Sequence, residues 1–291
     1  MPLTRIPGTH VWGYVFDSYN TNADGSLSLR SPRDTNFTPV AHPMGEGPGV
    51  RAAGAGGPVF PLTHQRPVIG ATIRVDAFPE ANAVTDARGY FILTNMPAPE
   101  FFVHVDGTTA SNAPPGTVYP SVGKPFHDIP GQSVQLAMGT NPFHVHLPPM
   151  ALADVAPLDT NALTDVFFGA NALAELARMF PTNDPAMFRK ICVHFPPGSA
   201  RDNLGRPATM GTIVPVPPDR IPAPLPPNLN PRLVISVQAM LPDGAAATRF
   251  DVPAPVIFPN LDGLAPGEKA LFFSFNHAAG RWDVIGTACS I

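Results

Sequence analysis

Residues 67–75 read Pro-Val-Ile-Gly-Ala-Thr-Ile-Arg-Val, and residues 85–91 read Thr-Asp-Ala-Arg-Gly-Tyr-Phe. Within residues 71–77 apolar and polar side chains alternate, as in a strand with one face in a core. Asp86 and Gly89 suit a tight turn, because an Asp side chain can bond nearby backbone and glycine accepts positive φ. The two stretches therefore predict a strand, a connection, a turn and a further strand. Neither contains a pattern typical of an active site.

The same two stretches resemble the carboxypeptidase regulatory-like domain, a seven-strand sandwich related to transthyretin. In that family the patterns found here at residues 67–75 and 85–91 mark two successive strand starts. The resemblance covers part of the first half of the chain. It implies an Ig-like β-sandwich that supports or displays other parts of a protein and performs no chemistry of its own.

Composition favours an all-β fold. The chain has 291 residues, enough for two sandwich-sized domains. Proline occurs 39 times, and it is poorly tolerated inside helices and central strands. Charged residues make up 14% and hydrophobic residues 44%, which is not the composition of a disordered polar chain. We therefore predict two β-sandwich modules in series.

Charge and hydropathy exclude two classes of partner. The net charge is −4 and no cluster of Lys or Arg is present, so the sequence lacks the basic surface that nucleic-acid binding requires. No apolar run is long enough to span a membrane. Residues 1–5, Met-Pro-Leu-Thr-Arg, also lack the apolar core of a signal peptide.

The first module is expected at residues 1–149. His10–Phe16 is rich in aromatic and β-branched residues and predicts the first strand. An insert at 17–66, rich in Asn, Gly, Ser and Pro, then departs from the pattern of the resembling family; a loop of this length is usually functional, partner-facing or flexible. Further strands are predicted at 70–77, 90–94, 101–105 and 143–147. Pro148-Pro149 marks the boundary.

The second module is expected at residues 150–291 and begins with a helical segment around 161–190. Apolar residues recur there at intervals of three and four. Asn171 is a candidate cap within the segment, and Asp184-Pro185 is typical of an N-cap followed by the first helical residue. Strands are predicted after the helices at 190–195, 209–216, 232–239, 248–258, 270–275 and 281–288, with a hairpin connection at 276–280.

Two stretches of this second module resemble extracellular proteins. Residues 193–200, Val-His-Phe-Pro-Pro-Gly-Ser-Ala, are similar to the opening of ZU5-like β-sandwich domains. Residues 258–267 and the hairpin after them are similar to a segment of very long secreted bacterial surface proteins. The resemblance implies an extracellular or cell-surface location, and a chain that belongs to a larger protein or assembly.

Three histidines are candidate metal ligands. His144 and His146 lie two apart on a predicted strand, so both side chains leave the same face, and His104 on another strand is the candidate third ligand. Zn²⁺ or Cu²⁺ would suit such a set. In the alternative interpretation, Phe143, Val145 and Leu147 fill the core while both histidines face solvent.

The two cysteines permit more than one interpretation. Cys192 and Cys289 permit one disulfide but do not require it, and the sequence favours ordinary reduced thiols. Cys192 and His194 share a strand face, but no known nucleophile motif surrounds them. We expect no cofactor, and the absence of a convergent catalytic set favours a non-catalytic protein.

The expected function is therefore that of a structural or interaction module in an extracellular assembly, as an adhesin, spacer, sheath or filament subunit. Residues 281–291 contain neither lysine nor proline, the residues that commonly protect a sheet edge. We expect this edge, or the insert at 17–66, to contact another chain or another copy of the protein. Carbohydrate binding through Trp12, Tyr14, Trp282 or the insert at 17–66 is the alternative, and a metal-dependent hydrolase using the histidines is a further one.

Overall fold

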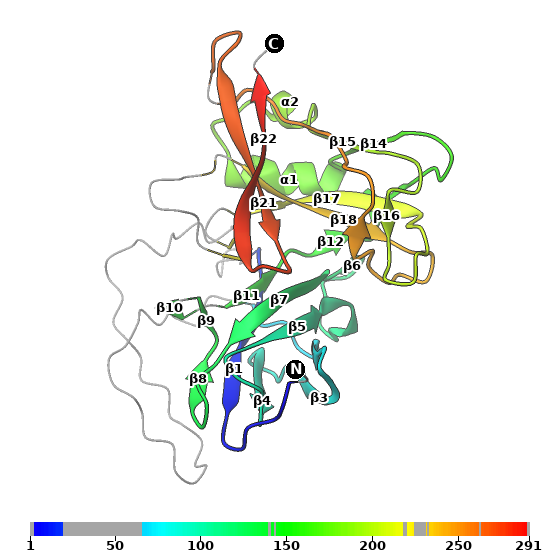
Figure 1. Ribbon diagram of the computed structural model, residues 1–291. Coiled ribbons are helices and arrows are strands. Elements are labelled where there is room, and N and C mark those ends of the chain that lie inside the picture. The colour runs from blue at the N-terminus through cyan, green and yellow to red at the C-terminus, as the bar shows by residue number, and fades with distance from the viewer. Residues whose placement is uncertain are drawn as a thin grey trace.

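A computed structural model describes residues 3–19, 66–138, 141–142, 144–217, 220–223, 231, 233–261 and 263–289. Strands make up 43% of the structure and helices 9%, which confirms the predicted all-β class. In Figure 1 the strands of the first half occupy the lower part of the molecule, and the second half with its two helices lies above them. The insert predicted at 17–66 lies outside the described residues except at its ends.

The first half has eleven described strands, of which the sequence predicted five. They are β1 (His10–Asp17), β2 (Thr72–Val75), β3 (Phe78–Val84), β4 (Tyr90–Thr94), β5 (Glu100–Asp106), β6 (Thr117–Val118), β7 (Ser121–His127), β8 (Ser133–Gln135), β9 (Ala137–Met138), β10 (Asn141–Pro142) and β11 (Val145–Leu147). A short 3-10 helix at Gly107–Thr109 follows β5. The strands predicted at 10–16, 90–94 and 101–105 are confirmed, while those predicted at 70–77 and 143–147 are shorter than expected.

Eight of these strands form two sheets that enclose one core, while β9 pairs with β10 and β6 pairs with β12. In the first sheet β1 pairs with β4 on one edge, and on its other edge with β8 near its start and β11 near its end. The second sheet has the order β3-β2-β5-β7, with antiparallel pairs throughout. Val11 and Phe91 of the first sheet join Ile73, Val103 and Phe126 of the second in a single buried cluster. The first half is therefore sandwich-like.

The turn that precedes β4 is the one predicted from the sequence. The Gly89 amide donates a hydrogen bond to the Asp86 carbonyl, and the Asp86 carboxylate accepts from the amides of Arg88 and Tyr90. Gly89 has φ of +73°. A Cβ at this position would lie 2.4 Å from the Val15 carbonyl oxygen of β1. Both the backbone angle and the close approach therefore require glycine.

The second half contains two helices and short sheets. Its elements are β12 (Met150–Ala151), a 3-10 helix (Leu152–Asp154), β13 (Ala156–Pro157), β14 (Thr164–Phe167), α1 (Ala170–Met179), α2 (Pro185–Phe188), β15 (Cys192–Phe195), β16 (Ala200–Arg201), β17 (Met210–Val216), β18 (Val234–Met240), β19 (Arg249–Phe250), β20 (Val256–Ile257), β21 (Lys269–Asn276) and β22 (Arg281–Cys289). The sheets have the orders β13-β17-β18, β14-β15-β20, β16-β19 and β21-β22.

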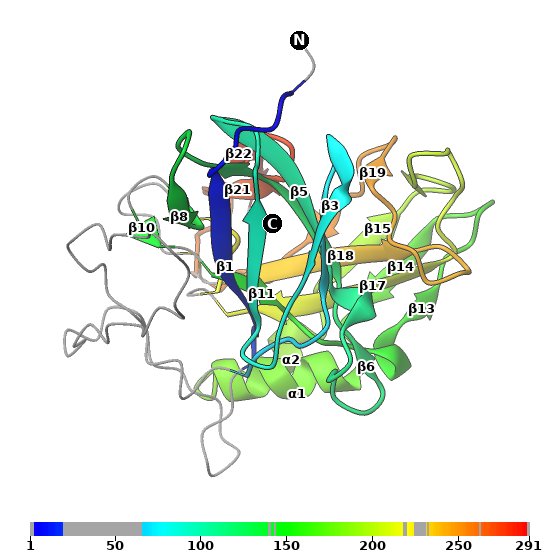
Figure 2. The same ribbon diagram turned by 90° about the horizontal axis from the view of Figure 1, so that it is seen from below.

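Helix α1 covers the core of this half. Figure 2 shows it running along one side of β17 and β18. Its buried Ala172 and Leu176 belong to a cluster with Val166 of β14, Val193 of β15 and Ile213 of β17. A stripe of small and aliphatic side chains at helical spacing is thus a packing surface, as the periodicity indicated.

The helical segment predicted around 161–190 is interrupted by a strand. Thr164–Phe167 forms β14, with Val166 buried and its neighbours Asp165 and Phe167 exposed. Helix α1 starts at Ala170 and is capped by the Asp154 carboxylate, which accepts from the Asn171 and Ala172 amides. Asn171 is therefore inside the helix and is not its cap. This arrangement depends on residues far apart in sequence, which local periodicity does not report.

Of the remaining local predictions for this half, the α2 cap and the hairpin connection agree with the structure, and one strand differs. Asp184 caps α2 through the Ala186 amide, with Pro185 as the first helical residue. The predicted strand at 248–258 is instead two short strands, β19 and β20. The hairpin connection at 276–280 is present between β21 and β22.

The two halves contact each other across the expected boundary at 149/150. Strand β12, directly after that boundary, pairs with β6 of the first half. Met150 lies in a small apolar cluster with Val214 and Met240, against which Val118 packs. The Tyr19 hydroxyl also donates to the Pro215 carbonyl at 2.5 Å. These contacts join Tyr19 and β6 of the first half to β12, β17 and β18.

Candidate functional site

The three predicted metal-binding histidines lie in different surroundings. His144 is only 7% exposed and sits edge-on to the rings of Tyr14 and Phe16, with centroid distances of 5.6 and 5.4 Å. His146 Nε2 lies 3.0 Å from a guanidinium nitrogen of Arg220. His104 pairs with Asp76 on the other sheet. The structure does not bring the donor atoms of the three histidines together.

Burial determines the charge of the two neighbouring histidines. It lowers the pKa of His144 to about 4, and the positive charge of Arg220 acts in the same direction. The same causes hold the pKa of His146 well below its usual value. Both rings are therefore neutral at neutral pH. The alternative in which both histidines face solvent is wrong for His144, because aromatic side chains of β1 enclose it.

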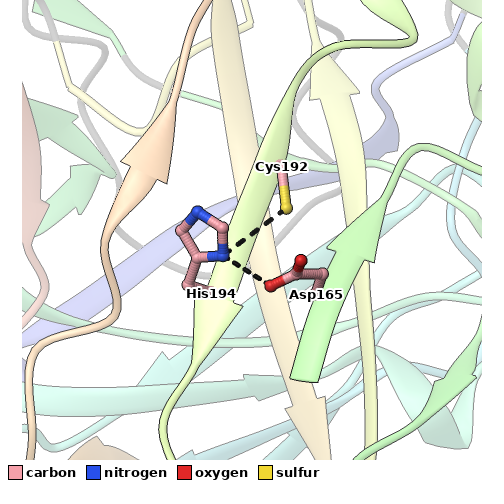
Figure 3. Close-up of side chains that lie close together, drawn as sticks. All are labelled: Asp165, Cys192 and His194. Atoms are coloured by element: carbon pink, nitrogen blue, oxygen red, sulfur yellow. Dashed lines mark hydrogen bonds and ion pairs between the residues drawn. The ribbon is translucent and has the colours of Figure 1, made fainter. Parts of the chain in front are cut away.

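A different group of donor atoms lies on β14 and β15. Asp165 is directly opposite His194, and Phe167 is opposite Cys192. Cys192 and His194 are two apart on β15, so all four side chains project from the same face. Figure 3 shows the Cys192 sulfur and the Asp165 carboxylate on the same side of the His194 ring, both near the same ring nitrogen. Among the described residues, Asp165, Cys192 and His194 form the one set whose donor atoms lie within 4.8 Å of one another.

The distances in this cluster exclude a Cys-His-Asp relay. The Cys192 Sγ lies 4.0 Å from His194 Nδ1, and Asp165 Oδ1 lies 2.5 Å from that same nitrogen. In a relay, one ring nitrogen faces the nucleophile and the other faces the carboxylate. Burial raises the pKa of the Cys192 thiol, and the negative charge of Asp165 raises it further. The thiol is thus not activated as a nucleophile.

The sequence indicated part of this cluster. Cys192 and His194 were expected on one strand face, and β15 confirms that expectation. Asp165 was missed because it fell inside the predicted helical segment. The signal that could have identified it is the alternation of exposed Asp165, buried Val166 and exposed Phe167, which is typical of a strand. Cys192 is a free, buried thiol, in agreement with the reduced alternative.

A second candidate site is the hairpin of β21 and β22. The two strands form a two-stranded sheet, and in the described part of the chain neither has a second neighbour. Leu271, Val284 and Ile285 are 58%, 57% and 65% exposed. A β-bulge interrupts the register between Phe272 and Phe273. The hairpin therefore presents both open edges and exposed aliphatic side chains.

The turn end of this hairpin is attached to other parts of the molecule. The Trp282 indole donates to the Ala223 carbonyl at 2.8 Å, and His277 Nδ1 lies 2.9 Å from the Gly123 carbonyl oxygen of β7. Figure 1 shows the hairpin, in orange and red, running from the neighbourhood of β7 to the top of the view. The turn end of the hairpin is thus held against β7 and the backbone at Ala223.

The three aromatic residues named as candidates for carbohydrate binding make ring contacts within the protein. Tyr14 is buried, and Trp12 packs against Tyr14 and Tyr90. Trp282 is partly buried and packs edge-on to Phe275. A sugar-binding platform needs an open ring face, which these contacts reduce.

Neither α-helix in the described part of the chain has the length and apolar composition needed to cross a bilayer. The chain matches no protein-family model, no curated protein and no solved structure.

Proposed function

We propose that this protein is a non-catalytic structural or interaction module of an extracellular or surface-exposed assembly, and that it associates with copies of itself through the β21–β22 hairpin. The observation that carries the proposal is a sheet of two long strands with no further strand on either edge among the described residues. Such an edge offers rows of free backbone N–H and C=O groups to another chain.

The side chains of the hairpin favour this use of its edge. Val284 and Ile285 of β22 and Leu271 of β21 are more than half exposed. Lysine and proline, which commonly prevent edge-to-edge pairing, are absent from residues 281–291. Pairing with another strand would bury these aliphatic groups, and burial of apolar surface is the main favourable term in association.

Other features are consistent with a non-catalytic role. In the cluster of Asp165, Cys192 and His194, the thiol and the carboxylate lie near the same imidazole nitrogen, which is not the geometry of a catalytic relay. The fold is all-β. The resemblances of residues 67–91 and 193–200 to surface-protein domains support the extracellular location and the division into modules at 1–149 and 150–291. The apolar contacts around Met150 would then fix one module on the other.

Sedimentation velocity of the intact protein at micromolar concentration tests the proposal. We expect a concentration-dependent oligomer for the wild type. A Val284→Lys/Ile285→Lys double variant should sediment as a monomer, because charge on an edge strand opposes pairing. Leu204→Lys is the matched control, since Leu204 is 82% exposed but lies in a turn away from the hairpin. It should behave as the wild type does.

Amide hydrogen exchange distinguishes the opposite case. If the wild type is monomeric at all concentrations and its 281–289 amides are protected, its own chain covers the edge and the proposal is wrong. If association persists in the double variant, another surface is responsible.

A further inference from the structure

The cluster on β14 and β15 combines three kinds of donor that zinc accepts. Asp165 offers a carboxylate oxygen, Cys192 a sulfur and His194 an imidazole nitrogen, all on one sheet face. Thiolate and imidazole together favour Zn²⁺ over Mg²⁺ or Ca²⁺, which prefer oxygen ligands alone. We propose that Asp165, Cys192 and His194 bind one Zn²⁺ ion.

The distances agree with this assignment after small side-chain movements. Bonds of about 2.3 Å to sulfur and about 2.0–2.2 Å to nitrogen or oxygen place tetrahedral S and N ligands ~3.5 Å apart and N and O ligands ~3.4 Å apart. The observed separations are 4.0 Å between Sγ and Nδ1 and 2.5 Å between Nδ1 and Oδ1. Each differs from the tetrahedral value by less than ~1 Å. Rotation of the Asp165 and His194 side chains, which are partly exposed, can supply that change.

The backbone holds the ligands without further rearrangement. The β14–β15 pair keeps Asp165 opposite His194 through four consecutive residue pairs. On the other side, β20 pairs with β15 and places Ile257 opposite Cys192. Because directly opposite residues share a sheet face, Phe167 and Ile257 flank the thiol on its two sides. The sulfur is therefore sheltered, while the carboxylate and the imidazole lie nearer to solvent.

Three protein ligands leave a fourth position for water, as in zinc sites with an open coordination position. Zinc requires the thiolate, so binding releases the thiol proton into solvent and is weaker at lower pH. The ion would connect β14 to β15 by bonds in addition to the backbone ladder. This inference does not depend on the proposed self-association, since the cluster lies on other strands than the hairpin.

Cobalt and zinc titrations of the metal-free full-length protein test the site. Co²⁺ is the spectroscopic probe, because a thiolate ligand adds a sulfur-to-cobalt charge-transfer band. We expect one Co²⁺ per chain with this band, displaced by Zn²⁺. Cys192→Ala should abolish the band, and Asp165→Asn and His194→Ala should weaken Zn²⁺ binding by more than the ~10–100-fold typical of losing an outer-sphere partner.

Two control variants make the result decisive. His104→Ala removes another His–Asp pair, in which Nε2 lies 2.8 Å from Asp76 but which has no thiol, and should leave binding unchanged. The chain has two cysteines, so Cys289→Ser should retain the charge-transfer band if Cys192 supplies the sulfur. This variant keeps the test valid even if Cys192→Ala fails to fold, which circular dichroism of the metal-free protein would show.

Loss of the band in Cys289→Ser would overturn the assignment. So would the absence of a band in the wild type, or equal Zn²⁺ affinity in wild type and a folded Cys192→Ala.

Discussion

Lys124 is a buried amine whose ionisation should affect stability. It lies on β7, is 2% exposed, and donates through Nζ to the Pro222 carbonyl at 3.2 Å. Burial disfavours the ammonium form and lowers the pKa of this side chain from 10.5 to about 7. Replacing it with methionine keeps a long side chain in the same space and removes the charge.

The sign of the effect follows from proton linkage. Between pH 7 and pH 10.5 the unfolded chain keeps the Lys124 proton while the folded protein has released it, so the free energy of unfolding rises with pH in this range. With a pKa of 10.5 in the unfolded chain and about 7 in the folded protein, the contribution of Lys124 to the free energy of unfolding rises by about 2 kcal/mol from pH 7 to pH 9. Lys124→Met should lack this increment and be more stable than the wild type at pH 7.

Urea unfolding at pH 7 and pH 9 measures the increment. The difference between Lys124→Met and the wild type should shrink by about 2 kcal/mol over this interval, since groups common to both proteins cancel. Lys190→Met is the matched control, because Lys190 is exposed. If the free energy of unfolding has the same pH dependence in the wild type and in Lys124→Met, burial does not lower the pKa of Lys124 and the prediction is wrong.

Three further substitutions test other parts of the structure. Gly89→Ala should lower the free energy of unfolding by more than about 1 kcal/mol, because its Cβ would meet the Val15 carbonyl in addition to the strain of positive φ. The control is Gly116→Ala, where φ is +72° and no atom lies within 4 Å of the new Cβ; an equal loss of stability in thermal unfolding of both variants would contradict the close approach. Asp154→Ala should cost about 1 kcal/mol and speed exchange of the Ala172 amide, since it removes the cap of α1; unchanged exchange would remove the capping role. His144→Phe should reduce the loss of stability between pH 7 and pH 4 by about 3 kcal/mol, because the unfolded chain binds a proton below pH 6.5 whereas the buried ring binds it only near pH 4. Denaturant titrations with the same acid dependence in the variant and the wild type would refute this.

The sequence by itself determined the features that depend on neighbouring residues. Local sequence patterns placed β1, β4 and β5, and the Asp86–Gly89 turn followed from an Asp that bonds nearby backbone and a glycine at positive φ. The cap of α2 at Asp184 was equally local. The shared face of Cys192 and His194 needed only the two-residue repeat of a strand.

Tertiary structure alone decided how distant segments meet. Asp165 lies opposite His194 because β14 pairs with β15 across the two helices, and periodicity had assigned β14 to a helix. Asp154 caps α1, although it lies 17 residues before the Asn171 amide that it accepts from. The side chains of His144 and Lys124 are buried, which no local sequence pattern predicted. The physical reason is that propensity and alternation act over a few residues, whereas strand pairing and desolvation depend on which remote segments pack together.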